Sequence, residues 1–192
     1  MTARELAEIA VRTCQWTHIF QVQVKRFLED FDRKGDGVFP WEGDDEMSLF
    51  AGDRIFMISA IQHVINGLDY MKSELRLRNE STEQIEEILN HIAAEETRNN
   101  IKLLRNMNEH DIEYMAGNGR KQDQFVRQLK KNGIEYSINA HWTFIDGKNK
   151  VFLIGNIDVI ALAKEVKKQS RNIDKLCSEL FCKYYWFNEK NR

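Results

Sequence analysis

Residues 53–79 read DRIFMISAIQHVINGLDYMKSELRLRN, and this stretch decides the expected fold. Its apolar residues recur at intervals of three and four, which places them along one side of an α-helix that begins near Asp53, or earlier, near Asp45. The apolar stripe consists of Ile55, Phe56, Ile58, Ile61, Ile65, Leu68, Met71 and Leu75. A helix of this length has to bury such a stripe against other helices, so the stretch predicts a helical bundle.

Helical patterns also lie on both sides of this stretch. Residues 2–31 predict a long first helix, with Thr2 and Glu5 spaced as a capping box at its start. After residue 79, Ser81 and Thr82 are suited to open a third helix. We expect this third helix to be the longest in the chain and to continue to the Gly-Asn-Gly sequence at 117–119.

The remainder of the chain predicts two helices and a β-hairpin between them. A short helix is expected at 121–131 and a last helix from Ile157 to about Phe187, capped by Asn156. Between them, residues 136–155 contain two runs of aromatic and β-branched residues. The Asp-Gly-Lys-Asn sequence at 146–149 separates the two runs, which is typical of a hairpin.

These patterns predict a mainly α protein, an up-and-down helical bundle with long helices plus one β-hairpin at about 136–155. We expect residues 1–192 to form a single helical domain. A loop is expected at 32–52, and the hairpin is expected to be an insertion packed on the bundle. The composition agrees, because one proline and ten glycines in 192 residues favour long helices over a many-turned β-sandwich.

The charge and the apolar content limit the classes of partner. The formal net charge is -2, so any basic patch for a nucleic acid must be local. No apolar run approaches the roughly 20 residues that cross a bilayer, so we expect no membrane partner and a cytoplasmic location. The cysteines Cys14, Cys177 and Cys182 have no CxxC spacing, which favours reduced thiols.

The residue types disfavour two kinds of metal site. A calcium loop that starts at Asp32 would have Lys34 at its third position and Gly43 at its twelfth, where oxygen ligands belong. A di-iron bundle needs Glu-x-x-His motifs, and neither His91 nor His110 has a glutamate three residues before it. We therefore expect no metal ligands and no cofactor.

The chemically most specific stretch is Arg105-Asn106-Met107-Asn108-Glu109-His110. On a helix, Asn106 and Tyr114 lie four residues on either side of His110 and so share its face. Arg105 lies about 140° from His110, but its long side chain can reach toward that face. A fixed cation, an amide and a titratable imidazole are the groups that hold a phosphodiester and move its protons without metal.

Basic residues in two groups could extend this edge into a groove for a phosphate backbone. A solvated helix face is the alternative for each group. The first group follows the motif and consists of Arg120, Lys121, Arg127, Lys130 and Lys131, and the second lies near the C-terminus and consists of Lys164, Lys167, Lys168 and Arg171.

The sequence Arg105-Asn106-x-x-x-His110, late in a helix of an all-α bundle, resembles the motif of the HEPN superfamily (higher eukaryote and prokaryote nucleotide-binding domains). The resemblance implies a metal-independent endoribonuclease, or an inactive nucleotide- or RNA-binding relative, in a defence or stress system. It also implies a homodimer in which both protomers contribute to one site. His110 would then be the general acid or base, Arg105 would bind phosphate, and Asn106 would orient the histidine or the RNA. Tyr114, Arg120, Lys121 and Arg127 are the candidate substrate-binding residues.

Three further hypotheses concern partners and function. In one branch of the superfamily, which is paired with an antitoxin, a tyrosine often stands two residues after the histidine. Ile112 occupies that place here, so an antitoxin partner is not supported by this sequence. A non-catalytic helical interaction or scaffold protein is the main alternative function. A metal-dependent helical enzyme is a weaker one.

Overall fold

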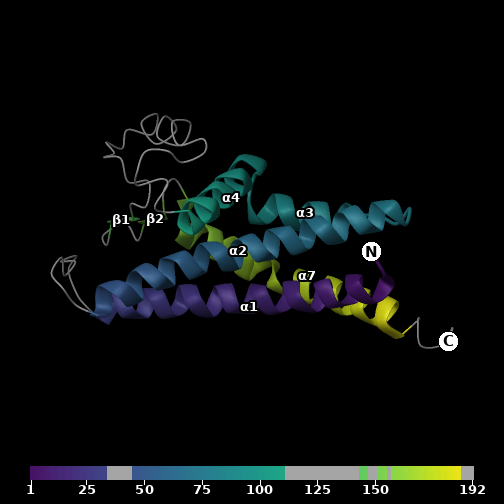
Figure 1. The fold of residues 1–192 in the computed structure, drawn as a ribbon, viewed down its shortest axis with the longest axis horizontal. Helices are drawn as coiled ribbons and strands as arrows, with labels where there is room; N and C mark the ends of the chain where they lie inside the picture. The colour runs from purple at the N-terminus through teal and green to yellow at the C-terminus, as the bar shows by residue number, and fades with distance from the viewer. Residues whose placement is uncertain (34–44, 111–142, 147–150, 155–156, 187–192) are drawn as a thin grey trace.

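The computed structural model describes residues 1–33, 45–110, 143–146, 151–154 and 157–186, and all structural statements concern these residues. This part of the chain is mainly helical, which confirms the expected mainly α class. Its helices are α1 (Ala3–Arg33), α2 (Asp45–Leu77), α3 (Glu83–Ile92), α4 (Glu95–Glu109) and α7 (Val159–Trp186) (Figure 1).

Three short strands precede α7 and form a small antiparallel sheet in the order β1-β2-β3. They are β1 (Thr143–Asp146), β2 (Val151–Ile154) and β3 (Ile157–Asp158). Thr143 is opposite Ile154 in the first pair, and Leu153 is opposite Asp158 in the second. β1 and β2 lie within the range 136–155. The rest of that range, including the turn at 147–150, lies outside the described residues.

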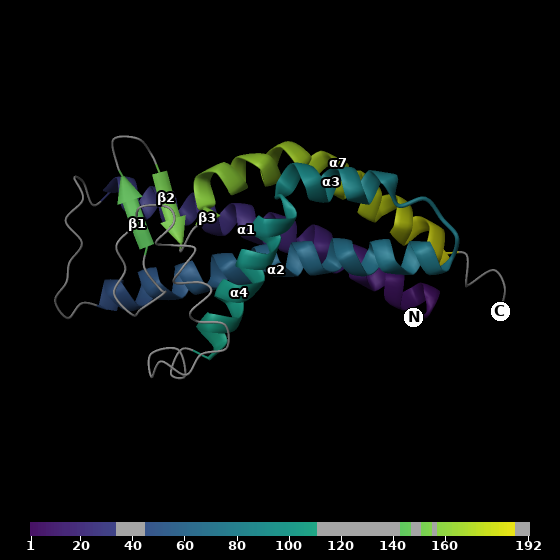
Figure 2. The same ribbon diagram turned by 90° about the horizontal axis from the view of Figure 1, so that it is seen from above.

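The three long helices form the body of the bundle. α1 packs along both α2 and α7, and α3 packs against α2 and α7 (Figures 1 and 2). α4 leaves this layer and crosses over α2, as Figure 2 shows. The amino end of α1 meets the carboxyl end of α2, since the Met1 ammonium lies 3.6 Å from Glu74. Helices that are distant in the sequence thus contact each other at two interfaces, α2 with α4 and α1 with α7.

The hydrophobic core runs the length of the bundle and contains the predicted stripe of α2 from Ile58 onward. Ile55 and Phe56 were expected in that stripe, but 39% and 42% of their surfaces are exposed. The largest fully buried side chains are Phe20, Leu6, Met57, Ile58, Ile61, Leu68, Met71, Ile85, Ile88, Leu89 and Ile101. Burial of these side chains from all of the first four helices ties them into one core.

α1 and α2 approach each other closely at a glycine, Gly67 of α2. A Cβ atom on Gly67 would lie 2.0 Å from Oγ1 of Thr13, so only glycine fits at this position. Thr13 is buried, and its hydroxyl donates to the carbonyl of Ile9 at 2.8 Å, which keeps the polar atom satisfied. The lack of a side chain on Gly67 therefore lets the backbone of α2 pack directly against the Thr13 side chain of α1.

The predicted start of α1 is right, but the predicted loop at 32–52 is too long at both ends. Thr2 and Glu5 form the capping box, with backbone-to-side-chain distances of 2.7 and 3.2 Å. α1 continues to Arg33 and α2 already begins at Asp45. The alternative start near Asp45 is confirmed, so Asp53 lies inside α2 and does not cap it. The Asp53 carboxylate accepts a hydrogen bond from Gln23 of α1 at 2.6 Å. Its role is to bind α1 to the interior of α2.

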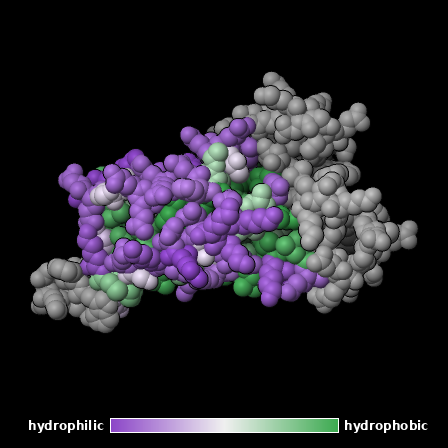
Figure 3. Space-filling view, turned by 180° about the vertical axis from the view of Figure 1, so that it is seen from behind, coloured by the Kyte–Doolittle hydropathy of each residue, from purple (hydrophilic) through white to green (hydrophobic). Residues whose placement is uncertain are grey.

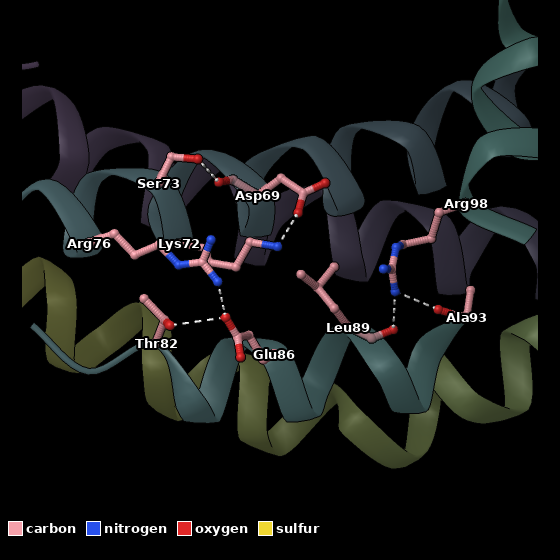
Figure 4. Close-up of polar contacts among 9 residues, drawn as sticks. All are labelled: Asp69, Lys72, Ser73, Arg76, Thr82, Glu86, Leu89, Ala93 and Arg98. Atoms are coloured by element: carbon pink, nitrogen blue, oxygen red, sulfur yellow. Dashed lines mark hydrogen bonds and ion pairs between the residues drawn. The ribbon is translucent and has the colours of Figure 1, made fainter. Parts of the chain in front are cut away.

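The expected single helix from 81 to 117 is wrong, because it breaks into α3 and α4 at Ala93 and Ala94. The backbone of Ala93 is extended, with φ -160° and ψ 137°. Arg98 explains how the break is stabilised: its Nη1 donates to the carbonyl of Leu89 at 3.2 Å and to that of Ala93 at 2.7 Å (Figure 4). The bond to Ala93 gives a donor to a carbonyl at the helix end, and the carbonyl of Leu89 accepts Arg98 in addition to the N–H of Ala93 at 3.1 Å.

Figure 4 also shows how α3 is attached to α2. Arg76 of α2 reaches across to the carboxylate of Glu86 on α3, which also accepts a hydrogen bond from Thr82 at 3.1 Å. α3 is therefore anchored by charge as well as by its buried stripe. The break after α3 then lets α4 turn over the face of α2.

The last helix starts two residues later than expected. Ile157 and Asp158 form strand β3, and α7 begins at Val159. The predicted cap, Asn156, lies outside the described residues. Asp158 takes the capping role, because its Oδ1 accepts a hydrogen bond from the backbone N–H of Ala161 at 2.9 Å.

The face shown in Figure 3 is mostly hydrophilic, with smaller areas of hydrophobic residues between the polar ones. None of the described helices is both long and apolar enough to pass through a bilayer.

Candidate functional site

The predicted catalytic motif lies in the last turn of α4. Arg105 and Asn106 are helical, but α4 ends at Glu109 and His110 is its C-cap, with φ -123° and ψ 39°. The N–H of His110 still donates to the carbonyl of Asn106 at 3.1 Å, so His110 keeps its position one turn after Asn106. His110 is exposed. His110 was expected late in a helix that continues to 117, but it is an exposed histidine directly after the end of α4.

The cation of the motif is held by its own helix. Nη2 of Arg105 lies 2.6 Å from Oε1 of Glu109, and its Nη1 donates to Oδ1 of Asn106 at 3.5 Å. The Arg105 side chain is 38% exposed, so solvent and ligands can reach it. Glu109 thus fixes the direction of the guanidinium and offsets part of its charge.

Arg105 and Asn106 line a polar hollow between α2 and α4, here called the α2–α4 hollow. Its volume is about 290 Å³. The lining residues of each helix lie about one turn apart, so they share one face of α2 and one face of α4. The hollow is lined by Gln62, Asn66, Asp69, Tyr70, Ser73, Lys102, Arg105 and Asn106.

One wall of the hollow carries a buried polar atom that needs a donor. Gln62 is only 5% exposed, and its Nε2 donates to Oδ1 of Asn66 at 2.6 Å. Its Oε1 has no hydrogen-bond partner among the described residues. A buried unpaired acceptor costs about 1–3 kcal/mol, so a donor from water or a ligand would stabilise this wall.

Two cations and one carboxylate set the charge of the hollow. Asp69 is already paired, because Lys72 lies 3.1 Å from its Oδ1. Lys102 is exposed and makes no ion pair with any described residue. Lys102 and Arg105 are therefore the cations that can attract an anion, although Arg105 is also paired with Glu109.

His63 is an additional titratable group near the motif. Its ring stacks on Trp16, with the centroids 4.3 Å apart. Burial lowers the pKa of His63, the charge of Arg105 lowers it further, and Glu109 opposes both effects. The sequence gives no signal for this group, because only the fold brings His63 of α2 near Arg105 and Glu109 of α4.

Only part of the predicted site can be located. Tyr114, Arg120, Lys121 and Arg127 lie outside the described residues. The second basic group, which begins at Lys164, lies on α7 and is exposed, away from the walls of the α2–α4 hollow. The structure therefore brings Arg105 and Asn106 together with Lys102 and the polar face of α2.

A second cluster joins α1 to α7. The ligand atoms of Cys14, His18 and Asp174 lie within 4.8 Å of one another. Cys14 and His18 have the i, i+4 spacing of one helix face, which is visible in the sequence. The cluster was not predicted, because Asp174 is distant along the chain.

No protein-family model, no curated protein and no solved structure matches this chain.

Proposed function

We propose that this chain is a HEPN-like, metal-independent endoribonuclease that acts as a homodimer. Its catalytic residues are Arg105, Asn106 and His110. The observation that carries the proposal is the placement of Arg105 and Asn106 in one polar hollow, with exposed His110 one helical turn further along α4.

The hollow supports the binding of a phosphodiester. Arg105 and Lys102 lie one turn apart on α4 and both face the hollow. A guanidinium binds two phosphate oxygens at once, and an ammonium adds a point charge. A phosphate that enters here would compete with Glu109 for Arg105. This arrangement favours a ligand with more than one negative charge, such as an RNA strand.

The walls on α2 support the binding of a nucleoside. The unpaired Oε1 of Gln62 can accept a hydrogen bond from a ribose hydroxyl or a base N–H. Tyr70 lines the same hollow and is 59% exposed, so its ring is open for stacking on an unpaired base. Single-stranded RNA offers both groups, which is why we favour it over duplex substrates.

The proposed reaction needs only proton transfer and charge stabilisation. His110 takes the proton of the ribose 2'-hydroxyl as that oxygen attacks phosphorus. Arg105 stabilises the charge on the phosphoryl oxygens. The leaving 5'-oxygen receives a proton from His110 of the partner subunit, and the products are a 2',3'-cyclic phosphate and a 5'-hydroxyl end. Asn106 positions the substrate or the imidazole.

The test is cleavage of single-stranded RNA of mixed sequence by the full chain in EDTA. We expect cyclic phosphate ends and no cleavage of the same strand with 2'-deoxyribose. H110A should lower the rate by about 100-fold or more while RNA still binds, because general acid–base catalysis supplies that much. R105M should weaken binding as well as cleavage.

His91 provides the matched control, because it is an exposed histidine on α3 outside the hollow. H91A should cleave RNA like the wild type. Cleavage by H110A at the wild-type rate would refute the assignment of His110. Failure of the wild type to bind or cleave diverse RNAs would refute the ribonuclease and favour the non-catalytic scaffold.

A further inference from the structure

Cys14, His18 and Asp174 converge at one point of the contact between α1 and α7. Cys14 and His18 are four residues apart on α1 and so lie on the same side of that helix. Asp174 of α7 contacts both: its Oδ1 lies 3.2 Å from Sγ of Cys14 and 3.3 Å from Nε2 of His18. A thiol, an imidazole and a carboxylate thus share one small volume.

We propose that these three residues bind a Zn²⁺ ion that fastens α1 to α7. In a tetrahedral zinc site with bonds of 2.0–2.3 Å, neighbouring ligand atoms are separated by roughly 3.3–3.8 Å. The two measured contacts, 3.2 and 3.3 Å, are already close to this range. All three ligand atoms lie within 4.8 Å, so small rotamer changes suffice to admit the ion.

The donor set selects the type of ion. Calcium and magnesium prefer oxygen ligands only, whereas a thiolate, an imidazole and a carboxylate together suit zinc. Three protein ligands leave the fourth position to water. His18 and Asp174 are 56% and 39% exposed, so an ion can enter from solvent and water can complete its coordination.

The position of the cluster in the chain gives the ion a stabilising role. Residues 14 and 174 are 160 positions apart, so a metal bond between their helices closes a very long loop. Such cross-links gain the most from loop closure, and metal binding to the folded state alone adds its free energy to folding. The cluster lies between α1 and α7, whereas the α2–α4 hollow is built from other helices. The zinc site does not depend on the ribonuclease proposal.

The test is titration of the metal-free full chain with Co²⁺ and then Zn²⁺. We expect one ion per chain, a thiolate-to-cobalt charge-transfer band and the intense visible bands of a tetrahedral site, all removed by zinc. Zinc should also raise the melting temperature, and EDTA should reverse the rise. C14S should lose the charge-transfer band. H18Q and D174N should each weaken zinc binding by at least about tenfold.

C182S and H91Q are the matched controls, because both residues are exposed and lie outside the cluster. Each control should bind cobalt like the wild type. His18 is largely exposed, so H18Q should fold even if C14S does not, and circular dichroism can check this. Absence of a thiolate-to-cobalt band in the wild type would refute the site and leave an ordinary hydrogen-bonded cluster. Zinc affinity unchanged in H18Q and D174N would refute these ligands.

Discussion

Glu109 competes with any incoming phosphate for Arg105, which lines the α2–α4 hollow. The two side chains are 2.6 Å apart, and both are more than one third exposed. Water screens such a pair, so the contact itself contributes only about 0.3–0.5 kcal/mol. The main effect of Glu109 is on the binding of the phosphate. A carboxylate beside the phosphate-binding guanidinium repels the same anion that Arg105 attracts.

Removal of the Glu109 charge should strengthen the binding of RNA. E109Q should tighten the binding of single-stranded RNA by about two- to fivefold at low salt, because repulsion is lost and Arg105 is freed. Fluorescence anisotropy at several salt concentrations measures the effect, which should shrink as salt rises.

Glu96 supplies the control for this prediction, since it lies in the first turn of the same helix and is exposed. E96Q changes the net charge equally but should affect RNA binding less than E109Q. Equal effects of the two variants would mean that only net charge matters, and that the contact between Arg105 and Glu109 does not regulate the hollow.

The contact between α1 and α2 shows how one residue controls the packing of two helices. Gly67 is in the middle of α2, where glycine costs about 1 kcal/mol relative to alanine. That cost is offset by the close approach of Thr13, whose Oγ1 and Cβ would lie 2.0 and 3.0 Å from an added Cβ. Thr13 is short and bonded to Ile9, so it has little freedom to move aside.

We therefore predict that G67A destabilises the protein although alanine is the better helix former. The clash should cost about 1–3 kcal/mol more than the helical gain. T13A removes the hydroxyl and should restore part of the loss in the double variant. Urea unfolding of the two single variants and the double variant completes the cycle. A double variant no more stable than G67A would show that the helices do not approach each other as described.

Element boundaries also show what could be predicted from the sequence. The apolar periodicity predicted α1, α2 and α7, because each of these helices buries a continuous apolar stripe. The spacing of Thr2 and Glu5 predicted the capping box. The break before α4 could not be predicted in this way. Ala93 and Ala94 favour helix, and the stabilising bonds come from Arg98 across the break.

The same limit applied to the candidate sites. A local motif identified Arg105 and Asn106, since their order along one helix is visible in the sequence. The opposite wall of the hollow belongs to α2, and Gln62 enters it only through tertiary packing. The cluster at Cys14 was missed for the same reason, because Asp174 comes from a distant helix. Contacts between elements, not residue types, were the missing information.

At the scale of the whole molecule, one end of the bundle joins three distant parts of the chain. Arg78, just after α2, donates to the carbonyl of Met1 at 3.0 Å. Glu80 accepts hydrogen bonds from Lys183 and Tyr184 of α7. The carboxylate of Glu80 therefore holds the connection between α2 and α3 against the end of the last helix.

The ionisation of Glu80 should make this junction sensitive to acid. Burial raises the pKa of Glu80, but hydrogen bonds from Lys183 and Tyr184 outweigh it, so the pKa lies below its ordinary value of 4.5. A carboxyl whose pKa is lower in the folded state stabilises the protein above its unfolded pKa. That stabilisation is lost as the pH falls through the folded value.

We predict that E80Q lowers the free energy of unfolding by about 1 kcal/mol near pH 7, a figure discounted for the partial exposure of the junction. The difference from the wild type should shrink as the pH falls below 4.5 and vanish once Glu80 is protonated in both states. Urea unfolding between pH 3 and pH 7 measures this, with E8Q as control because Glu8 is exposed and pairs only with Arg4 of its own helix among the described residues. If the free energies of unfolding of E80Q and the wild type differ equally at all these pH values, the charge of Glu80 does not hold the junction. The Glu80 side chain would then contribute only through its shape.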